Sequence, residues 1–197
     1  MAPELKSPSD LKISLFQNKD AWEDWLSNHF DSSSGLWLRI SKKQVELPSI
    51  TYPEALEVAL CYGWIDGQKK KYDEISWLQK FTPRGPRSIW SKINRAKALE
   101  LIERGMMKPA GLAAIERARK NGQWESAYDS FKTTTIPPDL QMALNKSPEA
   151  AAFFATLNSQ NRYAILFRIQ TAKKSETRQK RIEQFIRMLE RHEKLYP

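Results

Sequence analysis

The segment of residues 62–94 concentrates the side chains that could do chemistry. It contains a carboxylate near its start, Asp66, and a fixed cation further on, Arg84. A carboxylate beside a flexible glycine can act as a general acid or base, and an arginine can grip a carboxylate or phosphate through two parallel hydrogen bonds. We therefore predict a catalytic role for Asp66 and a ligand-binding role for Arg84. A structural ion pair between the two is the alternative.

Three tryptophans of the same segment add flat apolar surface: Trp64, Trp77 and Trp90. Indole rings stack on planar ligands and on nucleobases. Tryptophan at this density also packs into protein cores, which is the alternative. We predict that all three line a binding pocket together with Asp66 and Arg84.

Four further polar residues are predicted to contact a ligand: Lys69, Arg87, Ser88 and Asn94. Arg87 belongs to a loop that proline and glycine restrict in shape. Ser88 and Asn94 lie close to the start of a predicted helix, where free N–H groups attract anions, and capping that helix is the alternative. Lys69 opens a run of three lysines, which contacts phosphate or keeps a strand edge soluble.

Few residues are available for metal or thiol chemistry. The chain has two histidines and one cysteine, and neither histidine has the spacing of a metal ligand. We predict no metal and no cofactor, so any catalysis would be acid/base chemistry such as isomerisation, cyclisation or hydrolysis. Cys61 lies in an apolar helical pattern and is predicted to be a small buried side chain.

The chain is strongly basic, with a formal net charge of +9 and a sequence pI near 9.6. This balance favours anionic partners: small molecules, nucleic acid or acidic membrane surfaces. No apolar run approaches the roughly 20 residues of a membrane span, and the first residues lack a signal-peptide pattern, so we expect a cytoplasmic protein. The sequence does not indicate an oligomeric state.

The predicted elements that would position these residues are helices and a small sheet. Asn18 is a candidate N-cap for a helix over residues 18–30, and Thr51 begins a capping box for a helix that ends at Gly63. Alternating apolar residues predict strands, which we expect to form an antiparallel sheet of about three. Their predicted ranges are 36–42, 69–72 and 75–81.

The rest of the chain is predicted to be helical, so the fold class is α+β. Two helices follow, with apolar faces formed by Ile93, Ala96, Leu99 and Ile102 in the first and by Leu112, Ile115 and Ala118 in the second. The last predicted helix carries an apolar stripe and a basic face that includes Arg178 and Arg181. We predict that this basic face makes a weak contact with an anionic partner, and simple solvation is the alternative. The predicted organisation is an N-terminal α+β domain over 13–130, a linker over 131–138 and a helical module over 139–193.

Several blocks of sequence occur together in an order typical of one family. They are YGWIDG (62–67), FTPR (81–84), SIWSKIN (88–94), GMMKPAG (105–111), NGQW (121–124), PPDL (137–140) and ETR (176–178). The chain thereby resembles the YdeI/OmpD-associated, or bacteriocin-protection, family over most of its length. The resemblance implies a soluble α+β part followed by a helical module, and a role in stress or bacteriocin resistance. It implies no catalytic residues.

Three functions remain open at this point. The first is binding of an anionic or aromatic small molecule in a pocket around Asp66 and Arg84, with or without acid/base catalysis. The second is nucleic-acid binding through the basic C-terminal helix, and the third is binding of a protein partner by a resistance factor without catalysis.

Overall fold

The computed structural model describes residues 11–43, 47–130 and 134–197. The chain forms two compact units, one within Met1–Trp90 and Asn94–Glu125 and the other within Ser91–Ile93 and Ser126–Pro197. Of the predicted linker, residues 131–133 lie outside the described residues, and the predicted domain bounds remain a prediction. None of the described helices has the length and apolar character needed to cross a membrane.

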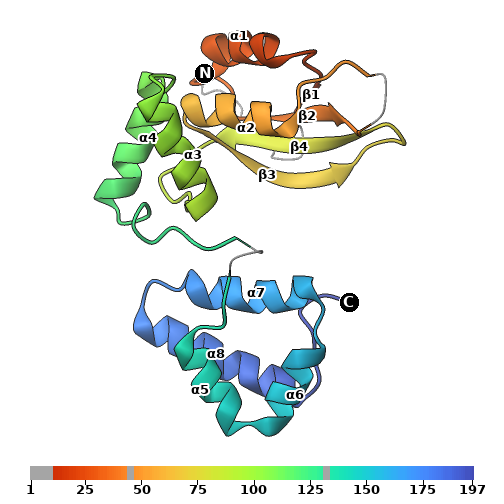
Figure 1. Cartoon of the computed structure of the whole chain (residues 1–197), viewed down its shortest axis with the longest axis vertical. Helices are drawn as coiled ribbons and strands as arrows, with labels where there is room; N and C mark the ends of the chain where they lie inside the picture. The colour runs from red at the N-terminus through yellow and green to blue at the C-terminus, as the bar shows by residue number, and fades with distance from the viewer. Residues whose placement is uncertain (1–10, 44–46, 131–133) are drawn as a thin grey trace, which may run out of the picture. The chain divides into compact units, whose positions relative to one another are not determined.

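A four-stranded sheet forms the centre of the first unit (Figure 1). Its strands are β1 (Ile13–Ser14), β2 (Leu36–Ser41), β3 (Trp64–Lys71) and β4 (Ser76–Pro83), in the order β1-β2-β4-β3. The three longer strands pair antiparallel and β1 pairs parallel with β2. The predicted α+β class and the predicted hairpin are confirmed. The expected count of about three strands was one short, because a two-residue strand has no periodicity to detect.

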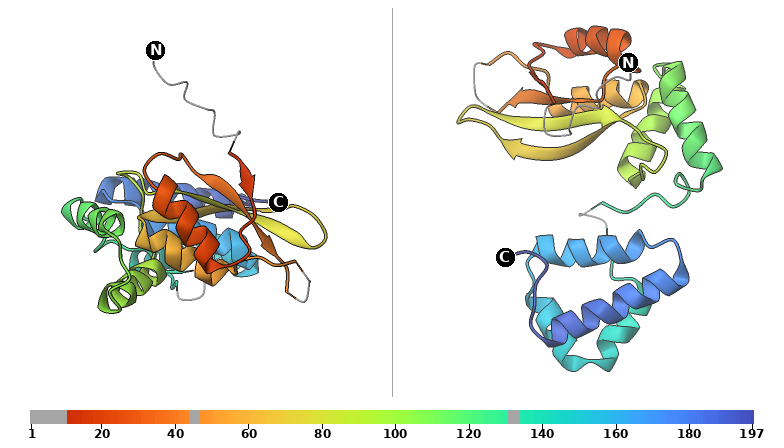
Figure 2. Two further views of the ribbon diagram at one scale, coloured as in Figure 1. Left: turned by 90° about the horizontal axis from the view of Figure 1, so that it is seen from above. Right: turned by 180° about the vertical axis from the view of Figure 1, so that it is seen from behind.

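Two helices, α1 (Lys19–His29) and α2 (Tyr52–Cys61), cover one face of this sheet (Figures 1 and 2). Leu38 and Phe81 point to that face and are fully buried. Trp22 of α1 contacts Phe81, with ring centroids 5.7 Å apart, and meets Trp64 of β3 edge-on at 6.2 Å. The helices are therefore held to the sheet by large aromatic rings, each burying some 150–250 Å² of surface.

Both ends of α2 follow the predicted signals. Thr51 caps the first turn and forms the full capping box with Glu54. Gly63 follows the last turn with a φ of +73°, a conformation that glycine adopts without strain. Cys61 is buried as predicted, and this burial raises the pKa of its thiol to about 11.

The next two helices are α3 (Lys92–Glu103) and α4 (Pro109–Lys120); α3 buries a different face from the one predicted, while α4 buries Ile115 and Ala118 as predicted but not Leu112. In α3 the buried residues are Asn94, Ala98 and Leu101, and in α4 they are Gly111, Ala114, Ile115 and Ala118. By contrast Ile93 is 49% exposed and Leu112 is 45% exposed. The predicted face of α3 was wrong, and in α4 the buried face is shifted toward the small residues Gly111 and Ala114, which allow close packing and carry little apolar signal.

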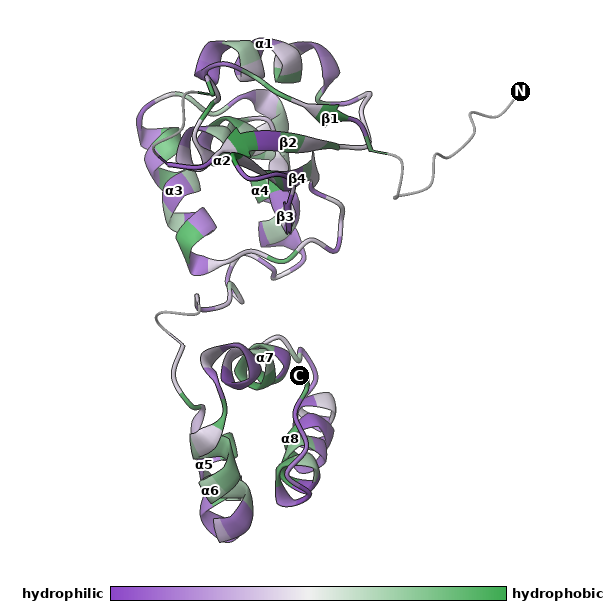
Figure 3. Ribbon diagram, turned by 90° about the vertical axis from the view of Figure 1, so that its right-hand side faces the viewer, coloured by the Kyte–Doolittle hydropathy of each residue, from purple (hydrophilic) through white to green (hydrophobic). Residues whose placement is uncertain are grey.

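The second unit consists of four helices: α5 (Pro138–Lys146), α6 (Pro148–Thr156), α7 (Ser159–Gln170) and α8 (Ser175–Glu190). The sequence predicts helices over 139–145, 148–157, 159–172 and 175–193, and each observed helix lies within three residues of these bounds. Ile182, Phe185 and Leu189 of α8 are buried in a core with residues of the other three helices. The opposite side of α8 is hydrophilic, as its amphipathic pattern requires (Figure 3).

The structure corrects the prediction that Arg178 and Arg181 belong to a basic face of α8 available for a weak anionic contact. Arg178 forms two hydrogen bonds to the carboxylate of Asp139, at 2.5 and 2.9 Å, and donates a third to the Ile169 carbonyl. Arg181 donates to the Arg168 carbonyl. Both arginines therefore tie α8 to α5 or α7, a role that periodicity within one helix cannot reveal.

Candidate functional site

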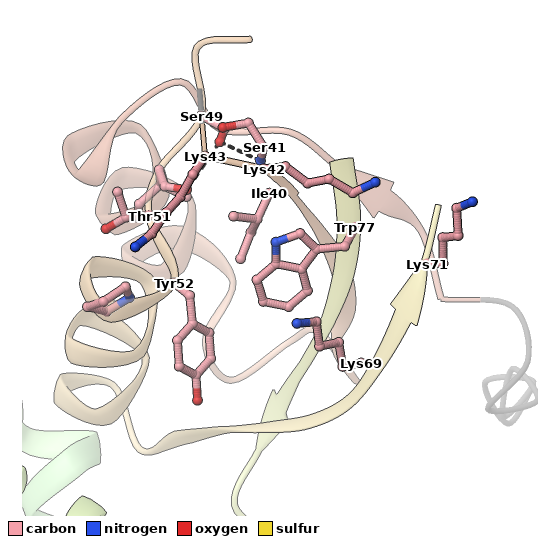
Figure 4. Close-up of a pocket in the computed structure, with 12 residues that line it drawn as sticks. Ile40, Ser41, Lys42, Lys43, Ser49, Thr51, Tyr52, Lys69, Lys71 and Trp77 are labelled. Carbon is pink, nitrogen blue, oxygen red and sulfur yellow. Dashed lines mark hydrogen bonds between the residues drawn. The ribbon is translucent and has the colours of Figure 1, made fainter. Parts of the chain in front are cut away.

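A pocket of about 660 Å³ opens in the first unit where the end of β2, the start of α2 and the β3–β4 hairpin come together (Figure 4). This size is within the usual range for small-molecule sites. The lining residues are Ile40, Ser41, Lys42, Lys43, Ser49, Ile50, Thr51, Tyr52, Pro53, Lys69, Lys71 and Trp77.

Two aromatic rings form the apolar part of the pocket. Trp77 of β4 lies opposite Ile40 of β2 in the sheet register, so both side chains project on the same face. Tyr52, the first residue of α2, lies beside Trp77 with ring centroids 6.0 Å apart and a tilt of 48°. Figure 4 shows the two rings next to each other, coming from the helix and from the sheet. A planar apolar group can pack against this pair.

Lysine side chains supply the charge of the pocket. The ammonium of Lys69 lies 4.2 Å from the centre of the Trp77 ring. Lys42 donates to two backbone carbonyls of the hairpin turn, those of Asp73 and Glu74, and Lys71 pairs with the Glu74 carboxylate at 2.8 Å. The fourth lysine, Lys43, also lines the pocket. The pocket therefore combines aromatic surface with an excess of positive charge.

Asp66 is connected to the pocket through Tyr52. The Tyr52 hydroxyl donates a hydrogen bond of 2.9 Å to the Asp66 carboxylate, while Asp66 itself is absent from the pocket lining. In this arrangement the carboxylate holds the tyrosine ring in place at the edge of the pocket. The geometry suits a positioning role for Asp66.

The beginning of α2 does not supply an anion site to the pocket, although the helix starts there. The Glu54 carboxylate accepts from both the backbone N–H and the hydroxyl of Thr51, at 2.9 and 2.7 Å. These hydrogen bonds lower the pKa of Glu54. A carboxylate of this helix thus already occupies its positive end, and an anionic ligand would depend on the lysines.

Arg84 lies in a different environment from Asp66. Its guanidinium stacks 3.5 Å from the centre of the Trp90 ring and donates to the Ile89 carbonyl. Arg84, Ser88 and Trp90 line a hollow of only about 10 Å³, which is at most the room of a single water molecule. Neither Asp66 nor Trp64 lines that hollow.

The remaining predicted site residues are also separated. Trp64 is fully buried, and its indole N–H donates to the Phe30 carbonyl. Asn94 is buried in α3 and Arg87 is exposed in the loop after β4. The structure thus brings Lys69 and Trp77 together and joins Asp66 to them through Tyr52. It does not bring the predicted set into one cavity.

Of the residues that line the pocket, sequence reasoning identified only Lys69 and Trp77 as site residues, and among those it missed are Lys42, Lys43 and Tyr52. Lys42 is the last residue of the predicted strand 36–42 and Lys43 follows it, and Tyr52 lies directly after Thr51 in the predicted capping box. A signal was nevertheless available, because the pairing of strand 36–42 with strand 75–81 places the end of the first beside the start of the second.

No group of three histidine, cysteine, aspartate or glutamate side chains in the described parts of the chain is arranged to hold a metal ion. The pocket lining itself contains no carboxylate, imidazole or thiolate. Its donors are lysine ammonium groups and hydroxyls, which suit an anionic ligand better than a cation.

Two family models match separate parts of the chain. Residues 14–114 match the model described as a domain of unknown function, DUF8412. Residues 133–192 match the model described as bacteriocin-protection, YdeI or OmpD-associated. No curated protein and no solved structure matches the chain. The predicted resemblance to the YdeI/OmpD-associated family is confirmed by the second match, while the motif blocks between residues 62 and 111 lie within the first.

Proposed function

We propose that this chain is a resistance protein that binds an anionic aromatic small molecule. The chain belongs to the DUF8412 family of domains of unknown function. Its residues 133–192 match the YdeI/OmpD-associated, bacteriocin-protection model, which is the source of the proposed resistance role. The ligand site is the pocket between β2, α2 and the β3–β4 hairpin. The observation that carries the proposal is the pair of Trp77 and Tyr52 rings beside the Lys69 ammonium.

Each part of the pocket has a role in this proposal. The ring of the ligand packs against Trp77 and Tyr52, and its anionic group lies near the amino groups of Lys43 and Lys69. Asp66 holds Tyr52 in the orientation that leaves room for the ligand. Binding requires no reaction, and protection would follow from capture of the compound.

The test compares three probes by isothermal titration calorimetry with the full chain. Naphthyl phosphate carries both a ring and a charge, naphthol carries only the ring, and inorganic phosphate carries only the charge. We expect naphthyl phosphate to bind more tightly than either of the others. Trp77→Leu and Lys69→Gln should each weaken its binding about tenfold, which corresponds to about 1.4 kcal/mol.

Arg87→Gln is the matched control, because Arg87 is an exposed cation of the same unit that lies outside the pocket lining. This variant should bind naphthyl phosphate as the wild type does. Equal affinity for naphthol and naphthyl phosphate would contradict the proposed role of the lysines. If Arg87→Gln binds naphthyl phosphate more weakly while Lys69→Gln binds it normally, the ligand site lies at the loop after β4 instead of in the pocket.

A further inference from the structure

The edge of the sheet carries three consecutive lysines, Lys69, Lys70 and Lys71, here called the edge lysines. They belong to β3, the last strand in the sheet order, and the described residues provide no strand on its outer side. Because side chains alternate along a strand, Lys69 and Lys71 project toward the pocket and Lys70 projects to the other face. The register agrees, since Lys71 is opposite Trp77 and Lys70 is opposite Leu78.

On the second face, Lys70 makes the same kind of contact that Lys69 makes in the pocket: its ammonium group lies over the ring of a tryptophan. Its ammonium lies 4.5 Å from the centre of the Trp37 ring, and Trp37 is only 7% exposed beneath it. Arg39 lies beside them on this face, 5.1 Å from the ring centre of Tyr72. A cation on an aromatic ring therefore occurs on both sides of the same edge strand.

Among the described residues of the first unit, no helix covers this second face. Seen from behind, the ribbons of β3 and β4 lie in front of α2 (Figure 2). We call it the open face and define it by Trp37, Arg39, Lys70, Leu78 and Lys80, which the strand register places on one side. Its apolar residues are largely covered, since Leu78 is 6% exposed and Trp37, under the Lys70 ammonium, is 7% exposed.

Charge on both faces favours an anionic partner. The carboxylates near the edge are already engaged: Asp73 with Arg39, Glu74 with Lys71 and Asp66 with Tyr52. A small molecule in the pocket can use Lys69 and Lys71 and cannot reach Lys70 on the opposite face. A partner that uses all three edge lysines must extend over the edge and must offer repeated negative charges and repeated rings.

We infer that this edge binds single-stranded nucleic acid, with one base in the pocket and the backbone crossing the edge lysines to the open face. Single strands bind where cations follow the backbone and aromatic side chains stack on the bases. A duplex keeps its ring faces covered by stacking, so it does not fit the pocket. This inference rests on the proposed function, because it assigns the anionic aromatic group in the pocket to a nucleotide.

The test measures fluorescence anisotropy of a labelled oligothymidylate of about 12 nucleotides, within the range of known single-strand site sizes. We expect the full chain to bind it with an affinity that falls as salt rises, with a log–log slope near −0.7 for each phosphate neutralised. Lys70→Gln should weaken binding and reduce the slope by about one phosphate. The same variant should bind naphthyl phosphate unchanged, because Lys70 is on the far side of the sheet from the pocket.

Two control variants locate the effect. Lys120→Gln removes an exposed lysine of α4, and we expect no change in oligonucleotide binding. Arg187→Gln removes an exposed cation of α8. If Arg187→Gln loses oligonucleotide binding while Lys70→Gln keeps it, the inference is overturned and the binding surface lies on the C-terminal helix.

The two proposals fail in different ways. Binding of naphthyl phosphate without salt-dependent binding of the oligonucleotide would overturn the nucleic-acid inference and leave the small-molecule site intact. Equal binding of a duplex would also overturn it. Absence of binding to both probes would contradict the proposed function itself and would leave the edge lysines as charges that prevent pairing between sheet edges.

Discussion

The hydrogen bond between the Tyr52 hydroxyl and the Asp66 carboxylate fixes the position of both side chains relative to the pocket. It joins the first residue of α2 to β3 across 14 positions of sequence. Asp66 is half-buried and Tyr52 lines the pocket, so under the proposed function the carboxylate would act on a ligand through the orientation of the ring. This role differs from the catalytic one that the position of Asp66 between an aromatic residue and a glycine suggests in the sequence.

Substitutions of Asp66 distinguish a positioning role from one that needs its charge. Asn at this position retains an oxygen that accepts from the Tyr52 hydroxyl, so Asp66→Asn should keep nearly full affinity for naphthyl phosphate. Asp66→Ala and Tyr52→Phe each remove the bond and should weaken binding roughly fivefold, since a typical hydrogen bond contributes about 1 kcal/mol. Calorimetry and thermal unfolding of the same variants provide the measurement. Equal losses in Asp66→Asn and Asp66→Ala would show that the charge matters.

The contact between Arg178 and Asp139 is an ion pair with two hydrogen bonds at the junction of α5 and α8. The hydrogen bonds from Arg178 hold the pKa of Asp139 below its ordinary value of 3.8. A carboxyl group whose pKa is lowered by folding stabilises the native state above the unfolded-state pKa. That stabilisation is lost as the pH falls through the folded-state pKa.

The effect of Asp139→Asn should therefore depend on pH. At neutral pH the variant should melt at a lower temperature than the wild type, because the ion pair is lost. As the pH is lowered below 3.8 the difference should shrink, since the wild-type carboxylate is then protonated too. Differential scanning calorimetry over this range gives the measurement, with exposed Asp31→Asn as a control for removal of a charge. A difference that is constant with pH would contradict the assignment.

Among the elements, the contact between the end of α2 and the start of α4 explains two of the family-like sequence blocks. A Cβ on Gly63 would lie 2.8 Å from the Ala110 carbonyl oxygen, and a Cβ on Gly111 would meet the backbone of Cys61. The Lys108 N–H also donates to the Cys61 carbonyl at 3.1 Å. Gly63 of YGWIDG and Gly111 of GMMKPAG therefore allow the backbones of α2 and α4 to touch, so these two glycines are required by the packing of the helices.

Gly63→Ala should destabilise the first unit more than Gly122→Ala. Both glycines have a positive φ, +73° and +72°, but a Cβ on Gly122 would meet nothing within 4 Å. Gly122→Ala should cost only the backbone strain, about 1–2 kcal/mol. Gly63→Ala adds the clash with Ala110, and we expect a further loss on the order of 1 kcal/mol or more. Urea unfolding of the two variants compares them, and equal losses would show that the junction adjusts without cost.

The elements that could be predicted from the sequence are those with strong local signals. The capping box at Thr51, the hairpin around Asp73 and the four C-terminal helices each depend on residues close together in the chain. The buried face of α3 was not predicted, and that of α4 was predicted only through Ile115 and Ala118, because the burial of small residues such as Ala98 and Gly111 depends on the shape of their neighbours. Hydrophobic periodicity counts large side chains and ignores such small ones.

The candidate site was predictable only in part for a similar reason. Lys69 and Trp77 were predicted on two neighbouring strands, and in the observed register Lys69 is paired with Gln79, two residues along β4 from Trp77 and on the same face. Tyr52 and Lys42 reach the same pocket from elements whose packing the sequence does not specify. Arg84 and Trp90 were predicted from their chemistry, yet they stack on each other, and a stacked arginine has the same sequence signature as a ligand-binding one.

For the molecule as a whole, the two units have cores of different composition. Large aromatic rings such as Trp22, Trp64 and Phe81 fill the first, and the second is mostly aliphatic around Ile165 and Phe185. The two sets share no residue in the described parts of the chain. We therefore expect the units to unfold as separate cooperative transitions.

Core truncations in the two units should act on different transitions. Phe81→Ala and Phe185→Ala each remove a buried ring and should cost about 3–5 kcal/mol. In calorimetry of the full chain, Phe81→Ala should lower one melting temperature and Phe185→Ala the other. A single transition that both variants shift equally would show that the units unfold together.

The burial of Cys61 makes the chain suitable for site-specific labelling. Its thiol is the only one in the sequence, it is 4% exposed, and its pKa of about 11 leaves almost no reactive thiolate at neutral pH. A maleimide dye would therefore react with a cysteine introduced at an exposed position, such as Gln68→Cys beside the edge lysines, and leave Cys61 unmodified. An environment-sensitive fluorophore attached there would report directly on whatever approaches this edge of the sheet, without a cysteine-free background having to be engineered first.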